Sequence, residues 1–229
     1  ALTEHEQFKN PKVITTPKGN KVLDFGQNIA GYIAFTINAK AGQTIRLRFG
    51  EMFDVEGEFT QKNIQCATKK RATPLQQVIY TCKDGVNKYK TKFAIFGFQY
   101  ALVEGDAPWK AEDFTAIAVY SDMEQTIRFD CSHPLIDQFV QNTLWSAKNN
   151  HADVPTDCPT RERHGWTGDA QGFFRTATVN RDVQTFFNKW MADVAAEQYA
   201  DGAVNGVYPV THRSRISAGW GDVATIIPW

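Results

Sequence analysis

The chain has 229 residues, of which 42% are hydrophobic and 22% are charged. This is ordinary globular composition, and it excludes a disordered, collagenous or coiled-coil chain. Its 25 basic and 25 acidic residues cancel, so we expect no general attraction to nucleic acid or to an anionic membrane. No apolar run approaches the ~18 residues of a membrane span. The first ten residues also lack the layout of a signal peptide. We therefore expect a soluble protein without a nucleic-acid or membrane partner, and its sequence marks no compartment.

Cysteine and histidine usage argues against a disulfide scaffold and against a metal site. The four cysteines are Cys66, Cys82, Cys131 and Cys158. They are too sparse for a disulfide framework and form no zinc-type pair, so we expect them to be reduced and mostly structural. The five histidines are scattered without metal-ligand spacing. No phosphate-binding loop is present either, and we expect neither a metal nor a cofactor.

The first half of the chain has the period of β-structure. Apolar side chains fall two residues apart in two neighbouring stretches: Ile33, Phe35 and Ile37, then Ile45, Leu47 and Phe49. Such alternation predicts strands with one buried face. The short turn-like segment 40–43 lies between the two stretches, so we expect them to pair as a hairpin.

Further strand signals follow along the chain. We predict strands over 77–81, 93–98 and 100–103, with Asp84-Gly85 as a turn, and another strand or pair of strands near 114–128. The polar stretch 54–73 is expected to be an excursion at one edge of the sheet. Several short strands joined by turns favour an antiparallel β-sandwich.

After Cys131 the apolar period becomes helical. Ser132 or its neighbour can cap a helix with Pro134 in its first turn. The apolar stripe of this helix comprises Leu135, Ile136, Phe139, Val140, Thr143, Leu144 and Ala147. Similar patterns predict helices over 168–178 and 183–198, the second stopped by Asp201-Gly202. Strands followed by helices suggest two domains rather than an alternating sheet. We place them at 1–125 and 126–229.

The last residues are also informative. The apolar segment that ends at Trp229 has no cap, basic last turn or polar tail. Three helices do not close most all-helical architectures, so we expect the chain to be a piece of a longer protein.

Chemically active side chains crowd into residues 151–170. The segment holds four carboxylates, two arginines and a tryptophan: Asp153, Asp157, Glu162, Asp169, Arg161, Arg163 and Trp166. Its prolines and glycines interrupt any continuous helix, so the carboxylates can converge from a folded loop. Carboxylates accept hydrogen bonds from sugar hydroxyls, and an aromatic ring covers the apolar face of a pyranose. A carboxyl with a raised pKa could also protonate a glycosidic oxygen. A solvated, salt-bridged loop with a packed tryptophan fits the same composition.

A resemblance to a known family favours the sugar-related interpretation. The motif Asp157-Cys-Pro-Thr-Arg-Glu-Arg-His-Gly-Trp-Thr-Gly-Asp169-Ala resembles the signature of the α-L-rhamnosidases of glycoside hydrolase family 78. Two earlier motifs, Asp24-Phe-Gly-Gln-Asn-Ile-Ala-Gly31 and Ala41-Gly-Gln-Thr-Ile-Arg-Leu-Arg-Phe-Gly-Glu51, are similar to the β-sandwich that precedes the catalytic domain in that family. Gly97-Phe-Gln-Tyr100 and Gly219-Trp-Gly-Asp222 resemble later family segments in the same order. The resemblance implies an antiparallel β-sandwich followed by the first helices of an incomplete (α/α)6 barrel.

The resemblance also implies a role for individual residues in an inverting hydrolysis of L-rhamnose-containing glycans or glycosides. Glu162 matches the general acid, which protonates the leaving oxygen while a base activates water. Asp157, Asp169 and Arg161 match groups that hold the rhamnose hydroxyls, and Trp166 matches an aromatic wall of the pocket. Trp220 and Asp222 match further substrate-binding residues. A packed indole and a helix cap are the structural alternatives for that pair.

Other polar residues are expected to be structural. Cys158 is expected to be a small buried filler rather than a nucleophile. Asp24 and Gln27 are expected to lie in a turn or interface. Arg163 and His164 stay outside the catalytic set.

The general base, a glutamate in this family, is expected beyond Trp229. The chain alone is therefore expected to be inactive. A non-catalytic carbohydrate-binding module, or an (α/α)6 hydrolase that acts on another sugar, remains an alternative.

Overall fold

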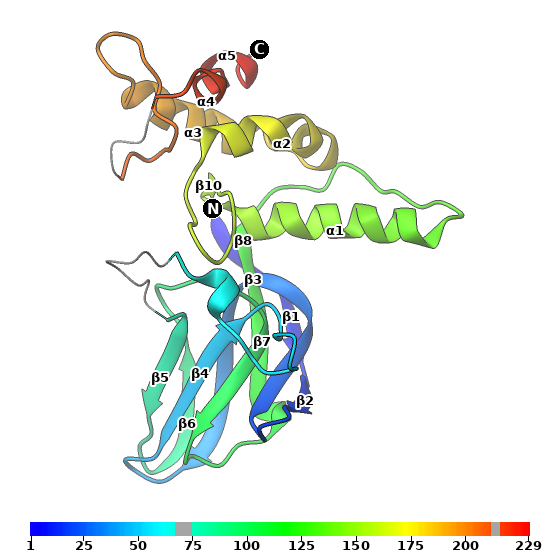
Figure 1. The fold of residues 1–229 in the computed structure, drawn as a ribbon, viewed down its shortest axis with the longest axis vertical. Helices are drawn as coiled ribbons and strands as arrows, with labels where there is room; N and C mark the ends of the chain where they lie inside the picture. The colour runs from blue at the N-terminus through cyan, green and yellow to red at the C-terminus, as the bar shows by residue number, and fades with distance from the viewer. Residues whose placement is uncertain (67–74, 212–215) are drawn as a thin grey trace. The chain divides into compact units, whose positions relative to one another are not determined.

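The computed structural model describes residues 1–66, 75–211 and 216–229. The chain divides into two compact units, residues 4–119 and residues 120–229 with 1–3. The first unit is a β-sheet and the second is mainly helical (Figure 1). The predicted fold class, antiparallel β-structure followed by helices, is confirmed. Among the helices of the described residues, none has the length and apolar character needed to cross a membrane.

Eight strands form the sheet of the first unit. They are β1 (Leu2–Lys9), β2 (Lys12–Thr15), β3 (Lys21–Ala39), β4 (Thr44–Gly50), β5 (Gln77–Thr81), β6 (Gly85–Lys90), β7 (Phe96–Gly105) and β8 (Phe114–Ser121). Two 3-10 turns, Lys62–Ile64 and Ala111–Asp113, interrupt the connections. The main path of neighbouring strands is β1-β8-β3-β7-β4-β5, and β2 and β6 also pair with β3.

The long strand β3 organises this sheet. It pairs antiparallel with β2 and β7 near its beginning and with β8 and β6 near its end. Its apolar side chains, such as Ile33, Phe35 and Ile37, are buried as their alternation predicts. Hydrogen bonding is therefore continuous through one curled sheet (Figure 1).

The motif that begins at Asp24 forms an irregular bulge in β3. Asp24 pairs with Tyr100, and the next regular pair is Ile29 with Phe98, so four residues of β3 lie outside the register. The Asp24 Oδ1 atom accepts the N–H of Gly26 at 2.8 Å, and Gly26 has φ +76°. This is the turn geometry that an aspartate followed by glycine stabilises. Asp24 is thus a turn residue, as predicted.

The predicted hairpin between β3 and β4 is wrong. Gln43 donates to the carbonyl of Lys40 at 3.2 Å, so a turn does form there. However, β4 pairs with β5 and β7, and β7 lies between β3 and β4 in the sheet. The neighbour of β3 at this position is therefore a strand from later in the chain.

Other strand boundaries also differ from the prediction. The expected strands at 93–98 and 100–103 are one strand, β7, and Phe93 before it is fully exposed. The sequence patterns missed β1, β2 and β6, whose burial alternates only weakly. Of the predicted edge excursion, the described part 54–66 contains one 3-10 turn. Its remainder, 67–73, lies outside the described residues.

The second unit contains the predicted helices. Its elements are α1 (Pro134–Asn150), the short strands β9 (His151–Ala152) and β10 (Val154–Pro155), α2 (Thr167–Asn180), α3 (Gln184–Ala196), α4 (Ala218–Gly221) and α5 (Val223–Ile226). Pro134 occupies the first turn of α1 as expected, where its missing N–H has no intrahelical partner to lose. The N-cap residue is His133, and no side-chain hydrogen bond caps the helix.

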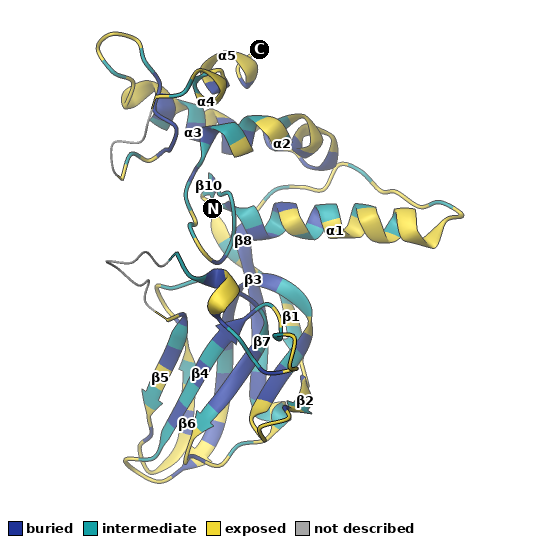
Figure 2. Cartoon of the chain, in the orientation of Figure 1, coloured by how far each residue is buried: buried dark blue, intermediate teal, exposed yellow. Residues whose placement is uncertain are grey.

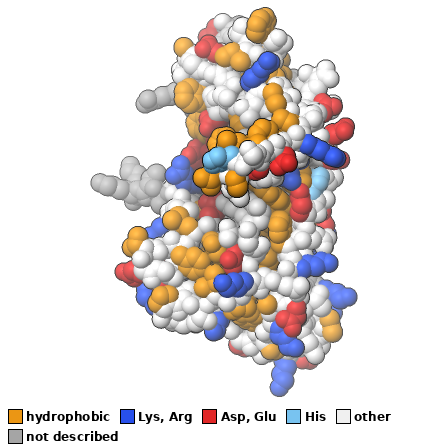
Figure 3. Space-filling model, turned by 90° about the vertical axis from the view of Figure 1, so that its right-hand side faces the viewer, with side chains coloured by type: hydrophobic (Ala, Val, Ile, Leu, Met, Phe, Trp, Pro, Cys, Tyr) orange, Lys and Arg blue, Asp and Glu red, His pale blue; other side chains and the backbone are white. Residues whose placement is uncertain are grey.

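The core of the second unit is built around α3. Its fully buried Trp190 packs with Phe187 and Val194, and Tyr208 and Val223 belong to the same cluster. By contrast, the predicted stripe on α1 is buried only at Leu144 and Ala147, and Leu135 is 74% exposed (Figure 2). Hydrophobic side chains accordingly gather on the face where α1 begins (Figure 3).

Candidate active site

The carboxylate-rich segment forms a closed loop between β10 and α2. Asp157 donates its backbone N–H to the carbonyl of His164 at 3.1 Å, and its Oδ1 atom accepts the N–H of His164 at 3.0 Å. This pair of bonds joins residues that are seven positions apart. The loop in between, which carries Arg161 and Glu162, is therefore held at both ends by one aspartate.

Glu162 lies against Trp166, as the sugar-site hypothesis requires. The indole Nε1–H of Trp166 donates to Glu162 Oε2 at 3.0 Å. The other oxygen, Oε1, forms an ion pair with Arg161 Nη2 at 3.2 Å. The Glu162 side chain keeps 31% of its surface exposed. Its carboxylate is thus oriented by two donors while it remains accessible to a ligand.

Asp169 completes a group of three carboxylates with Asp157 and Glu162. It lies in the first turn of α2. Its pKa is raised from the usual value, first by burial, then by the negative charge of Asp157 and also by that of Glu162. Charge repulsion of this kind acts only between nearby groups, so the Asp169 carboxyl lies near those of Asp157 and Glu162. The loop therefore converges on one acidic cluster.

A small cavity of about 250 Å³ lies beside this cluster. Asp157 and Asp169 both line it. The other lining residues come from the end of α1, the loop and the facing helices: Ser146, Ala147, Asn150, His151, Pro155, Thr156, Ala170, Phe173 and Phe187. A cavity with apolar walls and a few convergent polar groups is typical of small-molecule sites, although this one is slightly smaller than most.

Sequence reasoning missed His151 as a member of this cavity. Its ring is 3% exposed and packs against Phe186 and Phe187, with ring centroids 5.0 Å and 6.2 Å away. Burial, together with the charge of Arg181, lowers the pKa of His151 to about 4. His151 is therefore neutral at pH 7. In the sequence, His151 simply follows a predicted helix, and that position does not indicate that its side chain is buried.

The end of the loop is anchored to residues 205–208. Thr167 donates its N–H to Gly206 at 2.9 Å, and Tyr208 donates to the carbonyl of Gly165 at 2.9 Å. A Cβ atom on Gly165 would lie 2.0 Å from the carbonyl oxygen of Tyr208. Only glycine permits this approach. Trp166 and the start of α2 are thereby fixed to the buried core of the second unit.

Trp220 reaches the same helix end. A Cβ atom on Gly168 would lie 2.4 Å from the Trp220 indole, so this ring packs directly on the residue before Asp169. The indole is 41% exposed. Asp222 is the N-cap residue of α5, as the structural alternative expects, although its side chain makes no capping hydrogen bond.

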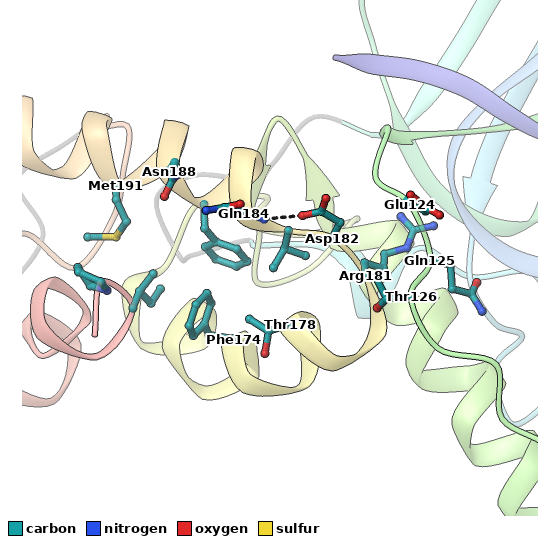
Figure 4. Close-up of a pocket in the computed structure, with 14 residues that line it drawn as sticks. Glu124, Gln125, Thr126, Phe174, Thr178, Arg181, Asp182, Gln184, Asn188 and Met191 are labelled. Atoms are coloured by element: carbon teal, nitrogen blue, oxygen red, sulfur yellow. Dashed lines mark hydrogen bonds between the residues drawn. The ribbon is translucent and has the colours of Figure 1, made fainter.

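A larger cavity of about 840 Å³ lies elsewhere in the second unit (Figure 4). Residues of α2 and α3 line it, together with residues 124–126, 181–183 and 227–228, and none of the predicted site residues takes part. Within the described part of the chain, no group of three His, Cys, Asp or Glu side chains is arranged to hold a metal ion. The loop with Glu162 remains the candidate site because it brings carboxylates and an aromatic ring together beside the cavity that Asp157 and Asp169 line.

Comparison with known proteins identifies the family. Residues 14–120 match the model of the bacterial alpha-L-rhamnosidase concanavalin-like domain. Residues 124–229 match that of the bacterial alpha-L-rhamnosidase 6 hairpin glycosidase domain. A sheet domain followed by a hairpin glycosidase domain defines the class as a glycoside hydrolase. The chain belongs to the bacterial α-L-rhamnosidase family.

Individual relatives agree with this assignment. An alpha-L-rhamnosidase of Formosa agariphila is 36% identical over 213 residues, which cover 91% of this chain and 22% of that protein. One from Streptomyces avermitilis is 35% identical over 222 residues, covering 94% of this chain and 21% of that protein. The chain therefore spans about a fifth of the length of these curated relatives.

Solved structures match the whole chain. The alpha-L-rhamnosidase of Dictyoglumus thermophilum superposes with a TM-score of 0.91 at 28% identity, covering 100% of this chain and 26% of that chain. The Streptomyces avermitilis enzyme complexed with L-rhamnose also gives a TM-score of 0.91, at 31% identity, covering 100% of this chain and 22% of the other.

Proposed function

We propose that this chain supplies the general acid and part of the sugar pocket of an α-L-rhamnosidase. The observation that carries the proposal is the position of Glu162, whose carboxylate is held by the indole of Trp166 and acts on the Asp169 carboxyl group. A solved relative binds L-rhamnose and superposes with a TM-score of 0.91. The reaction is hydrolysis of terminal α-L-rhamnosyl residues from glycans or glycosides.

Glu162 acts as the acid in this proposal. When protonated, it gives its proton to the glycosidic oxygen as the bond to the anomeric carbon breaks. The indole N–H of Trp166 fixes one carboxyl oxygen, at 3.0 Å, and Arg161 contacts the other. Positioning of this kind keeps the acid in line with the leaving oxygen. A second carboxylate, from the rest of the six-hairpin domain, activates the attacking water in an inverting mechanism.

The remaining predicted residues bind the sugar. Asp157 and Asp169 face the cavity of about 250 Å³ and accept hydrogen bonds from the ring hydroxyls. Trp166 and the half-exposed Trp220 offer apolar surfaces for the pyranose face and the C6 methyl group. Asp222, two residues after Trp220, is the remaining residue proposed to bind the sugar.

The experiment uses a chimera, because the base is expected outside this chain. This chain replaces the aligned segment of the Streptomyces avermitilis enzyme, which makes up 21% of that protein. We expect the chimera to release L-rhamnose from an unactivated rhamnoside. Glu162→Gln should lower kcat at least ~10²-fold, since the amide has no proton to donate to the leaving group.

The matched control is Glu56→Gln, because the Glu56 side chain is 72% exposed and belongs to the sheet unit. It should leave kcat unchanged. An activated rhamnoside with a good leaving group should lose much less activity on Glu162→Gln than the unactivated one. Unchanged turnover of the unactivated substrate by the Glu162→Gln chimera would contradict the assignment, as would a folded but inactive parent chimera.

A further inference from the structure

Cys158 lies at the centre of the loop that carries Glu162. Its Sγ atom accepts the backbone N–H of Glu162 at 3.2 Å. The backbone N–H of Arg163 also bonds to this sulfur, and the thiol bonds to the carboxylate of Asp157. The sulfur therefore contacts both the residue proposed as the acid and a residue proposed to bind the sugar.

We propose that Cys158 is a positioning residue that fixes the backbone of Glu162 relative to Asp157 for the hydrolysis. This inference rests on the proposed function. The expectation of a passive buried filler does not account for three hydrogen bonds to one side chain. A filler would contact apolar neighbours, whereas this sulfur joins polar groups at both ends of the loop.

The backbone of the loop explains why an acceptor is needed at this point. Arg163 has φ +54°, a left-handed conformation that non-glycine residues seldom adopt. The chain reverses there, so two successive N–H groups, from Glu162 and Arg163, point toward the same atom. Partly buried N–H groups that lose their acceptor are costly. The sulfur stabilises the turn that aims the Glu162 side chain at Trp166.

The protonation state of the thiol fits this role. Burial is the largest of the causes that raise the pKa of Cys158, and the Asp157 carboxylate raises it further. The group therefore remains a thiol at neutral pH, and its S–H can donate to Asp157 while its lone pairs accept the two N–H groups. Asp157 in turn holds the N–H of His164 at 3.0 Å. One chain of bonds thus runs from His164 through Asp157 and Cys158 to Glu162.

Two substitutions in the chimera test the proposal by activity. Cys158→Ala removes the acceptor and should lower kcat by up to ~10²-fold, because small displacements of a catalytic group have effects of that size. KM should change less than about two-fold, since the substrate contacts remain in place. Cys158→Ser keeps a donor and an acceptor, although closer to the backbone, and should restore most of the lost kcat. Cys131→Ala is the matched control, because its sulfur bonds locally to the backbone of His133, two residues away, and it should leave kcat unchanged.

Amide hydrogen exchange in the 229-residue chain separates this inference from the proposed function. Cys158→Ala should accelerate exchange at the N–H groups of Glu162 and Arg163, while exchange in β3 of the sheet unit stays the same. Unchanged exchange, or faster exchange with unchanged kcat, would overturn the positioning role. If Glu162→Gln keeps full activity but Cys158→Ala frees both amides, the proposed acid fails and the assigned bonding of the loop stands. If Cys158→Ala does not fold, Cys158→Ser must show the same changes in weaker form, and its failure to do so would also overturn the proposal.

Discussion

The sheet unit and the helical unit hold their acidic side chains in opposite ways. In the sheet unit, hydrogen bonds from Lys90 and Tyr32 lower the pKa of Glu4, and the backbone N–H of Thr44 lowers the pKa of Asp106. Each of these carboxylates secures a strand edge or a turn. Their charged forms are compensated by donors on the same unit.

In the helical unit, Asp169 shows the opposite shift. Burial and the charges of Asp157 and Glu162 raise the pKa of Asp169. Arg161 forms an ion pair with Glu162, and the Arg161 side chain is 49% exposed. Placing Asp169 beside other carboxylates disfavours its charged form and contributes nothing to folding stability at neutral pH. Clusters of this kind are characteristic of functional sites. The difference between the two units therefore favours the loop 157–169 as the functional site.

The largest expected effect concerns the close approach that anchors the loop. Gly165→Ala would place a Cβ atom 2.0 Å from the Tyr208 oxygen and 3.3 Å from Trp190 Nε1. We expect the free energy of unfolding of the helical unit to fall by about 3 kcal/mol, because neither the backbone nor the buried indole can move freely. Segment-resolved hydrogen exchange should show faster exchange in α2 and α3 and unchanged exchange in the sheet strands.

Gly172→Ala provides the matched control for this substitution. Gly172 lies inside α2, and a Cβ atom there would meet nothing within 4 Å. The change should stabilise the helical unit by about 0.5–1 kcal/mol, since alanine is the better helix former. Equal effects of the two substitutions would refute the view that the loop depends on this contact with the core.

The sequence predicted those parts of the structure that have a clear local period. The strand at 77–81 and the helices that begin near Pro134, Thr167 and Gln184 agree with the patterns of two and of about 3.6 residues. The motif at 157–169 likewise directed attention to Glu162 and Trp166, whose side chains are bonded to each other in the structure.

The remaining features depend on contacts between distant residues. Strand order could not be predicted, because β7 inserts between β3 and β4 only through pairing over many residues. The burial of His151 depends on Phe186 and Phe187, which come from α3. The bonds to Cys158 depend on the left-handed backbone conformation at Arg163. Glycine would have indicated such a conformation in the sequence, but this position is an arginine. Each of these follows from tertiary packing rather than from local sequence.

A second prediction concerns His151, a buried base of the helical unit whose charged form is disfavoured. Burial first, and Arg181 second, lower the pKa of His151 from 6.5 to about 4. The unfolded chain therefore binds a proton at higher pH than the folded chain does. The contribution of His151 to the free energy of unfolding is fully present above the pKa of histidine in the unfolded chain, and it is lost as pH falls toward 4. Between pH 7 and pH 5 the free energy of unfolding should fall by about 2 kcal/mol from this residue alone.

Urea denaturation at several pH values measures this effect. His151→Leu should remove most of the loss between pH 7 and pH 5, because leucine has no proton to bind. His5→Leu in β1 is the control, since no comparable burial surrounds that side chain, and it should keep the original pH dependence. If the His151→Leu protein loses as much stability on acidification as the unchanged chain, His151 does not carry the dependence.

The smallest expected effect tests the contrast between the two units directly. A carboxyl with a raised pKa destabilises the fold as pH rises above its unfolded value, and the penalty persists at pH 7. Asp169→Asn removes the charge while it keeps the shape, so the helical unit should become more stable by at most ~1 kcal/mol, because solvent screens part of the repulsion. Asp106→Asn in the sheet unit should act in the opposite direction, since the pKa of Asp106 is lowered by the backbone N–H of Thr44. Urea denaturation of both variants at pH 7 measures the direction of each change in the free energy of unfolding. A loss of stability in Asp169→Asn would mean that the charged form of Asp169 is favoured by folding, like the acids of the sheet.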